Sequence, residues 1–326
     1  MQNNINTTLS NITYPYSLCN IDDEQLYKYS ILIIASICSF VGNLMVILIV
    51  YRNKNLRTST NYFIVNMSVS DILSPLFVLI DNKFLFSKVS HRWLFPFFIS
   101  VCFGVSMLTL LVITILRFSA VVFPLRARVQ NKRKRLLVLL LTWVLPIAMS
   151  SPYLIYRKLS GERQRYFMIA NNQRFRNWST ANVLLFFFLP LLIMLVLYPL
   201  IIIRLRKHKV PGNANFSDAG IRRAKLNFRL TIMFIVITVA FLLSWGPYVM
   251  IYLLFIWTNE RWILLNIDPC IFAYTLFISL ITPVVFHAIN PVLYFIFCSS
   301  FRQGFKNIFQ SSCCSKTKTR GTCRET

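Results

Sequence analysis

The sequence predicts an all-α membrane protein: a seven-transmembrane helix bundle followed by a short amphipathic helix on the inner leaflet. Of its 326 residues, 56% are hydrophobic and only 14% are charged, whereas soluble domains carry about 25% charged residues. The apolar residues form seven long runs, each close to the ~20 residues that cross a bilayer as a helix. The 35 Lys and Arg residues lie in short clusters between these runs, which is typical of membrane flanks and does not favour nucleic-acid binding.

Each run is expected to be a helix because every backbone N–H and C=O in lipid must be paired within its own segment. Strands of a membrane barrel would be about half as long and would alternate in polarity. The expected spans, in chain order, are 29–51, 62–85, 95–123, 136–156, 180–204, 228–257 and 270–297.

The distribution of Lys and Arg predicts an extracellular N-terminus, because the connections that are then cytoplasmic carry about twice as many of these residues as the outer ones. We therefore expect an extracellular tail (1–28), a seven-transmembrane domain (29–298), an amphipathic juxtamembrane helix (299–310) and a cytoplasmic tail (311–326). Three sequons agree with this orientation and are candidates for glycosylation: Asn6 and Asn11 in the tail, and Asn177 in the second outer loop.

The segment after the seventh run places Phe301, Phe305 and Phe309 four residues apart, beside a basic face. This pattern indicates a helix that lies along the inner leaflet. Cys313 and Cys314 follow it, close to the membrane surface, and are candidates for palmitoylation. Two free cytosolic thiols are the alternative.

Polar residues and prolines recur within the spans, and both need a reason in lipid. Their pattern resembles that of the rhodopsin-like (class A) G-protein-coupled receptors over about residues 29–310, closest to the neuropeptide receptors. The matching motifs are Gly42-Asn43, Asn66 to Asp71, Ser106 with Leu110, Ile113 and Arg117, then Trp143, Phe187 with Pro190 and Tyr198, Phe241 to Pro247, and Asn290 to Tyr294.

The resemblance implies an activation switch in the inner half of the bundle. A proline within a helix removes one backbone hydrogen bond and allows a kink, so Pro247 beside Trp245 is expected to make the sixth helix a two-state element that a ligand can bias. The switch residues implied are Arg117, Tyr198, Phe241, Trp245, Pro247, Asn290, Pro291 and Tyr294.

The resemblance also implies a polar core of Asn43, Asp71, Ser106 and Asn290, which holds a sodium ion in the family. Here Phe286 and His287 stand where small polar residues are usual, so sodium binding stays open. His287 could hydrogen-bond into the core, although we favour a packing role for it.

Two departures from the family pattern affect the ends of the bundle. Leu116-Arg117-Phe118 replaces Asp-Arg-Tyr, and Asn227 stands at the facing position of the sixth helix, which predicts a weak resting lock and high basal signalling. Most family members have a disulfide from the third helix to the second outer loop, and this sequence has neither of the two cysteines. Cys19 and Cys270 are the only outward-facing pair, so we expect a bridge between them, with free thiols as the alternative.

The ligand is expected in a pocket between the outer halves of the helices. Ile99 offers no carboxylate to a monoamine, and Val284 offers no lysine for retinal. A peptide is our first choice, and an anionic lipid or other small acidic ligand is the alternative, because the second outer loop is basic. Asp81 could instead pair with a cationic peptide residue. The expected pocket residues are Asp81, Ile99, Phe103, Tyr248, Tyr252, Phe255, Tyr274, Phe277 and Leu280.

The predicted function is that of a plasma-membrane receptor that couples an extracellular ligand to heterotrimeric G proteins, with arrestin as a further possible partner. The basic inner loops would also attract anionic membrane lipids. We expect no enzyme and no metal centre, because the sequence offers no paired catalytic carboxylates, no nucleophile with a base and no metal-ligand spacing. A secondary transporter is a remote alternative, since it would require internal repeats and broken helices.

Overall fold

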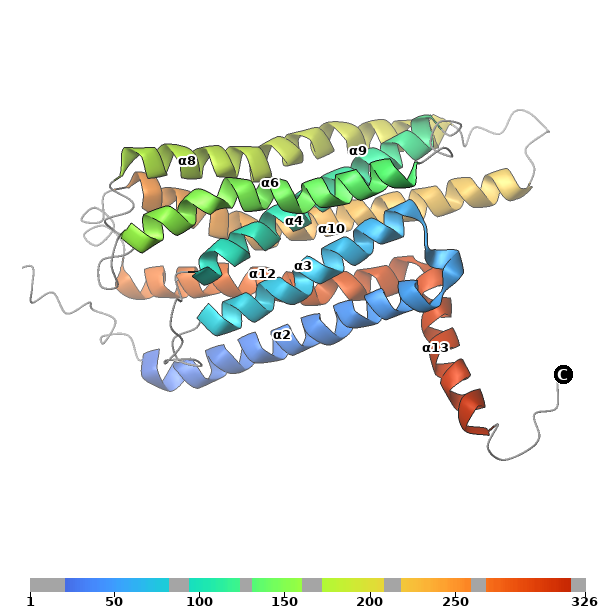
Figure 1. The fold of residues 1–326 in the computed structure, drawn as a ribbon, viewed down its shortest axis with the longest axis horizontal. Helices are drawn as coiled ribbons and strands as arrows, with labels where there is room; N and C mark the ends of the chain where they lie inside the picture. The colour runs from blue at the N-terminus through green and yellow to red at the C-terminus, as the bar shows by residue number, and fades with distance from the viewer. Residues whose placement is uncertain are drawn as a thin grey trace, which may run out of the picture.

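The computed structural model describes residues 21–81, 94–123, 131–159, 172–207, 218–258 and 268–317, and all regular structure in these ranges is helical. Long helices lie side by side in one bundle, and the last helix leaves it at one end at an angle (Figure 1). We call this end the α13 end. The helices are α2 (Ile21–Arg52), α3 (Ser59–Asp81), α4 (Phe95–Val122), α6 (Lys132–Leu159), α8 (Gln173–Val183), α9 (Leu189–Lys207), α10 (Asp218–Trp257), α12 (Pro269–Phe297) and α13 (Ser299–Thr317), with a 3-10 turn η2 (Lys54–Leu56) and a π-helical turn η4 (Leu184–Phe188).

Seven helices of the described ranges are long and apolar enough to cross a membrane. In the fifth of these spans, α8, η4 and α9 follow one another without a break. The predicted all-α, seven-helix fold is therefore confirmed.

Several helices extend beyond the apolar runs that predicted them. α2 begins at Ile21 within the expected tail, α10 begins at Asp218, and α13 continues to Thr317 beyond the expected end at 310. α3 is described as far as Asp81, and the expected end of the second span at 85 lies outside the described residues. Hydropathy marks only the part of a helix inside hydrocarbon, whereas backbone hydrogen bonding continues into polar sequence.

The expectation that Asn177 lies in an outer loop is wrong, because α8 begins at Gln173. The side chain of Asn172 caps this helix by accepting hydrogen bonds from the backbone N–H groups of Arg174 and Phe175, at 3.0 and 3.3 Å. An Asn at this position satisfies donors that the first helical turn leaves free. The fifth helix therefore starts in polar sequence, and Arg176 lies on it as well.

The helix α4 occupies the centre of the bundle and packs against α3, α6, α9 and α10. Its contact with α6 is close because Gly104 has no side chain: a Cβ atom there would lie 2.8 Å from the Cβ of Pro146. In contrast, α6 exposes Leu136, Leu137 and Leu140 on its outer face, as expected for side chains that contact lipid.

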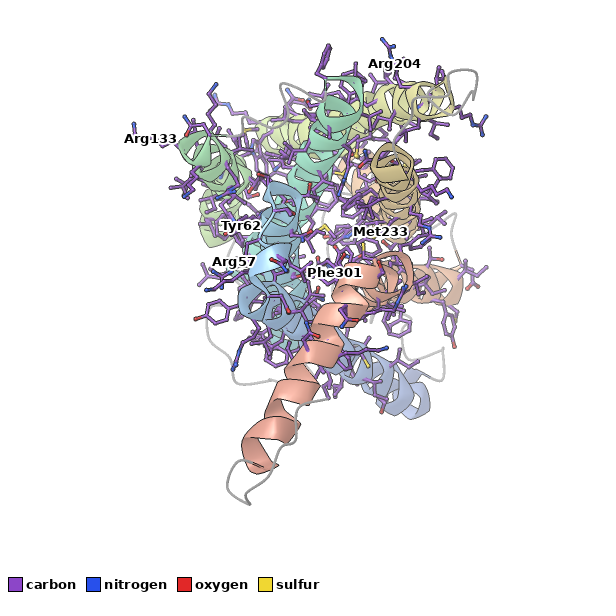
Figure 2. The ribbon with its side chains drawn as sticks, turned by 90° about the vertical axis from the view of Figure 1, so that its right-hand side faces the viewer. Arg57, Tyr62, Arg133, Arg204, Met233 and Phe301 are labelled. Carbon is purple, nitrogen blue, oxygen red and sulfur yellow. The ribbon has the colours of Figure 1, made fainter. Side chains whose placement is uncertain are left out.

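The helix α13 docks against the bundle through its first turns. Phe301 is buried and stacks on Tyr294, with ring centroids 5.9 Å apart, and Gly304 lies against Ile49 of α2. Figure 2 looks at this end and shows Phe301 beside the helices of the bundle. The prediction that Phe301 faces the leaflet is therefore wrong, since its ring is buried against Tyr294 of α12. The side chain of Phe309 lies outside the described residues.

Basic side chains surround the α13 end. Arg57, Arg133 and Arg204 are exposed there and come from three different parts of the chain (Figure 2). These residues belong to the basic connections that the sequence assigned to one side of the membrane, and the structure places them at one end of the bundle.

Candidate functional site: a polar core and an aromatic hinge

Asp71 lies at the centre of a buried polar core, with no exposed surface. Its Oδ1 atom is 2.8 Å from Nδ1 of His287 and accepts a hydrogen bond from Ser106 at 3.4 Å. Its Oδ2 atom accepts a hydrogen bond from the amide of Asn290 at 2.8 Å. A buried carboxylate is costly unless it is paired and hydrogen-bonded. Two helices supply these partners here: Ser106 lies on α4, and His287 and Asn290 lie on α12.

Asn43 belongs to this core but does not contact the carboxylate. Its amide donates to the backbone oxygens of Ser39 and His287, at 2.9 and 3.0 Å. The hydroxyl of Ser39 in turn donates to the backbone oxygen of Asp71 at 2.8 Å. Asn43 therefore ties α2 to α12 and reaches α3 through Ser39.

His287 is fully buried, and its contact with Asp71 overturns the packing role that we favoured from the sequence. One signal could have revealed this contact. His287 lies three residues before Asn290, and residues at this spacing share one face of a helix. A face that presents Asn290 to Asp71 therefore presents His287 to it as well.

His287 contacts Trp245 as well as Asp71, and Trp245 lies at the centre of an aromatic cluster. Its ring centroid lies 4.7 Å from that of Phe103 and 6.0 Å from that of His287. Phe241 and Tyr248, one turn to either side on α10, lie 6.1 and 5.7 Å away. The predicted switch residues Phe241 and Trp245 are thus in contact through their rings, and Phe103 joins them to α4.

Pro247 lies within α10 and removes the backbone donor that would bond to the oxygen of Leu243. The neighbouring carbonyl, of Ser244, accepts a hydrogen bond from the hydroxyl of Thr282 on α12, at 2.9 Å. A side chain from another helix therefore stabilises the backbone beside the proline. No motif in the sequence marks Thr282, since only the folded structure brings it to this carbonyl.

Arg117 lies near the C-terminal end of α4, and its guanidinium carbon is 5.5 Å from the ring centroid of Phe234 on α10. Among the described residues, no carboxylate lies within salt-bridge distance of it. A cation over an aromatic face is attracted by about 0.5–2 kcal/mol. Phe234 thus contacts the guanidinium of Arg117, which in the family pattern pairs with a carboxylate.

Tyr198 joins three helices through its hydroxyl. The group is 2.9 Å from the hydroxyls of both Thr114 on α4 and Thr238 on α10, and it donates to the backbone oxygen of Phe234 at 3.3 Å. Tyr294, the other predicted tyrosine of the switch, is fully buried, and its hydroxyl has no partner among the described residues. The two tyrosines therefore differ in how firmly they are held.

The predicted pocket residues lie at the end of the bundle opposite α13. The hydroxyl of Tyr252 donates to Ser179 on α8 at 3.1 Å, and the ring of Tyr252 stacks on Tyr248 with centroids 6.4 Å apart. Tyr274 and Leu280 on α12 are 39% and 48% exposed, whereas Ile99, Phe255 and Phe277 are half-buried. The side chain of Asp81 lies outside the described residues.

The predicted modification sites are described only in part. Cys270 is disulfide-bonded, but Cys19 lies outside the described residues, so the pairing of these two stays a prediction. Asn177 is exposed, and its amide oxygen accepts a hydrogen bond from Gln173. Asn6 and Asn11, and the side chains of Cys313 and Cys314, are not described.

The comparison with protein families gives one match of wide extent. A family model described as "7 transmembrane receptor (rhodopsin family)" matches residues 42–294. This range includes the polar-core residues Asn43, Asp71, Ser106, His287 and Asn290, and also the aromatic hinge, which is Trp245 with its neighbours on α10.

Individual known proteins are similar over much of the chain. Neuromedin-U receptor 2 of Mus musculus is 29% identical over 300 residues, which cover 84% of this chain and 72% of that protein. Neuropeptide receptor 22 of Caenorhabditis elegans is 29% identical over 315 residues, covering 85% and 67%. Cholecystokinin receptor type A of Rattus norvegicus is 34% identical over 197 residues, covering 56% and 44%.

Proposed function

The chain belongs to the rhodopsin family of seven-transmembrane receptors, and from this premise we propose that it binds an extracellular peptide and activates a heterotrimeric G protein. The family is one of receptors, so the chain is not an enzyme. One observation above all supports the proposal: a continuous series of contacts joins Tyr252 at the pocket end to Phe241 through Trp245, past the proline of α10. We further propose that the α13 end is cytoplasmic, since Arg57, Arg133 and Arg204 surround it.

The series of contacts begins at Tyr252, which is bonded to Ser179 and stacked on Tyr248. Tyr248 meets Trp245 edge to face, and Trp245 contacts Phe241. All four aromatic residues, from Tyr252 to Phe241, lie about one turn apart along α10. A ligand that displaces Tyr252 therefore acts on the side of α10 that carries the proline kink.

A kinked helix can occupy two arrangements, and a ligand shifts their populations by as much as its affinities for them differ. Pro247 weakens α10 at the level of Trp245, and Thr282 holds the backbone beside it. In the proposed mechanism, a ligand bound at the pocket end favours an arrangement in which the inner half of α10 swings outward. That movement separates Phe234 from Arg117 and opens a site for the G protein.

A peptide is favoured as the ligand by two observations. The similar proteins include one named as a neuropeptide receptor, and the pocket end offers large aromatic side chains. Tyr and Trp combine a broad apolar surface with one polar atom, which suits the mixed side chains of a peptide. Tyr248, Tyr252 and Trp257 supply such surfaces.

A small acidic ligand is the second candidate, because basic groups lie at the same end. Arg174 is exposed at the start of α8, and the guanidinium of Arg176 lies over the ring of Trp257 at 5.7 Å. These groups would attract an anion and steer it toward the pocket. An acidic peptide would satisfy both candidates.

The test is G-protein activation in cells that express the receptor, first without ligand, then with a peptide library, and then with a panel of anionic lipids. We expect a peptide to activate, and Trp245→Ala to abolish most of that response at normal surface expression. Leu243→Ala is the matched control, since Leu243 lies on the same helix and is 71% exposed. Activation by lipids alone would favour the second candidate, and an unimpaired Trp245→Ala response would contradict the hinge.

A further inference from the structure

The polar core around Asp71 is the place where the family resemblance leads one to expect a sodium ion. A sodium ion is a hard cation, and such ions bind to oxygen atoms that offer lone pairs, carboxylates above all. Whether this chain suits one depends on which atoms face the carboxylate of Asp71.

The atoms that meet this carboxylate are two nitrogens and one hydroxyl oxygen. His287 contacts Oδ1 through Nδ1 at 2.8 Å, and Asn290 donates its amide N–H to Oδ2 at the same distance. Ser106 donates its hydroxyl to Oδ1. Both oxygens are therefore engaged, and a cation on Oδ1 would compete with the imidazole for the same position.

Two buried amide oxygens, on Asn43 and Asn290, have no donor among the described residues. They are chemically suited to a cation, but the amide of Asn290 turns its nitrogen to Asp71. Its oxygen leaves the same carbon in another direction and so points away from that contact. The amide of Asn43 donates to Ser39 and to the backbone of His287. In both amides, the nitrogen and not the oxygen makes the contacts within the core.

We propose that His287 replaces the cation: its imidazole is the internal counter-group of Asp71, and the ligand-free fold of this receptor needs no sodium ion. The proton between Nδ1 and Oδ1 joins α12 to α3, two helices that a bound ion would otherwise join. A buried carboxylate requires such a partner, and a covalently attached one is present at every salt concentration.

The imidazole of His287 also packs against the ring of Trp245 at the hinge. A bound ion, which is much smaller, would not make such a ring contact. The centroid of His287 lies 6.0 Å from that of Trp245 and 5.8 Å from that of Phe286. Nε2 of His287 and Nε1 of Trp245 are both buried without a partner among the described residues. A movement of Trp245 therefore changes the packing around the imidazole that contacts Asp71, so His287 positions the polar core relative to the hinge.

The experiment measures the melting temperature of the purified, ligand-free receptor in sodium chloride and in choline chloride at equal ionic strength. For the wild type we expect the same Tm in both salts. For His287→Ser we expect a lower Tm in choline chloride and a partial recovery in sodium chloride, because the vacated space and the new hydroxyl admit an ion. A wild-type Tm that rises in sodium chloride would overturn the proposal.

Two further variants separate charge from hydrogen bonding. His287→Gln keeps a donor for Asp71 but cannot become a cation, so we expect it to lose stability and gain sodium dependence as His287→Ser does. If His287→Gln had the same Tm as the wild type in both salts, the contact between His287 and Asp71 would be an ordinary hydrogen bond. This result would overturn the counter-group role. Asp71→Asn combined with His287→Ser should remove the sodium dependence, and its persistence would place the ion elsewhere.

The wild-type protein alone also provides a test, in case the His287 variants do not fold. Sodium NMR of the purified receptor should show no line broadening beyond that of empty detergent micelles, whereas a bound, exchanging ion would broaden the line and contradict the proposal. Neither measurement needs a ligand or a G protein. A failure here is thus distinct from a failure of the proposed function.

Discussion

Arg117 lies beneath the ring of Phe234, and the residue before it is Leu116 rather than an acid. A cation–π contact weakens rapidly once the ring moves away, and it offers no hydrogen-bond acceptor to the guanidinium. Nε of Arg117 is in fact buried without a partner among the described residues. At the scale of the residue, the side chain of Arg117 therefore meets α10 at an aromatic face and not at an acid.

We predict that Leu116→Asp lowers ligand-independent signalling, because a neighbouring carboxylate would pair with Arg117 and stabilise the resting arrangement. A partly exposed ion pair between the new Asp and Arg117 would stabilise the resting arrangement by up to about 1 kcal/mol. This free energy corresponds to a several-fold decrease in the active fraction. The measurement is basal G-protein activation at matched surface expression. Leu116→Asn is the control for polarity without charge, and basal activity that stays at the wild-type level would contradict a weak lock.

Tyr198→Phe is a second prediction at this scale. The substitution removes the hydroxyl that joins Thr114 to Thr238, at a cost of about 1 kcal/mol or more for the hydrogen bonds lost. Both threonines retain bonds to backbone oxygens, Thr114 to Leu110 and Thr238 to Phe234, so neither is left without a partner. We expect a lower Tm, whereas Tyr51→Phe, at a ring that is 69% exposed, should leave it unchanged. Equal melting of the two variants would count against the bridging role of Tyr198.

At the scale of the element, close helix contacts depend on single glycines. Gly104→Ala would place a Cβ atom 2.8 Å from Pro146, a distance that requires α4 and α6 to separate. We predict that this variant loses about 1–3 kcal/mol of unfolding free energy, as is typical of overpacked sites. Its Tm should therefore be lower than that of the wild type. Gly246→Ala is the matched control, because nothing lies within 4 Å of its Cβ position and Ala favours a helix interior. A Tm for Gly104→Ala at or above that of Gly246→Ala would show that the two helices can adjust.

The elements also show where the sequence was sufficient and where it was not. Hydropathy placed seven spans correctly because lipid tolerates few polar residues. It missed the starts of α8 and α10, where Asn172 and Asp218 stand in polar sequence beyond the hydrocarbon. Motif spacing identified Asp71 and Asn290, whose contact the structure contains. It could not assign Thr282 or Phe234, because their roles come from helix packing that spacing along one helix does not describe.

At the scale of the whole molecule, the arrangement of charge predicts the orientation in the membrane. An epitope tag at the N-terminus should be accessible to antibodies on intact cells, and a tag at the C-terminus only after permeabilisation. An odd number of spans requires the termini to lie on opposite sides. Tags that are both accessible on intact cells would contradict the seven-span arrangement.

The candidate glycosylation sites give an independent measure of the same orientation. Asn177 is exposed on α8, whereas the amide of Asn66, which is also in a sequon, bonds to Thr109 and accepts from Trp143 within the bundle. We predict that Asn177→Gln reduces the mobility shift caused by deglycosylation and that Asn66→Gln does not. A shift that depends on Asn66 would contradict the membrane position of α3.

The π-helical turn Leu184–Phe188 has a consequence for the fifth span that reaches beyond its own five residues. Such a turn contains one residue more than a regular helix would need, and one residue corresponds to a rotation of about 100° about the axis. The turn thus sets the angular phase between the two halves of the span. Deleting a single residue there would leave Tyr198 facing Thr238 and carry Ser179 around the axis, away from Tyr252.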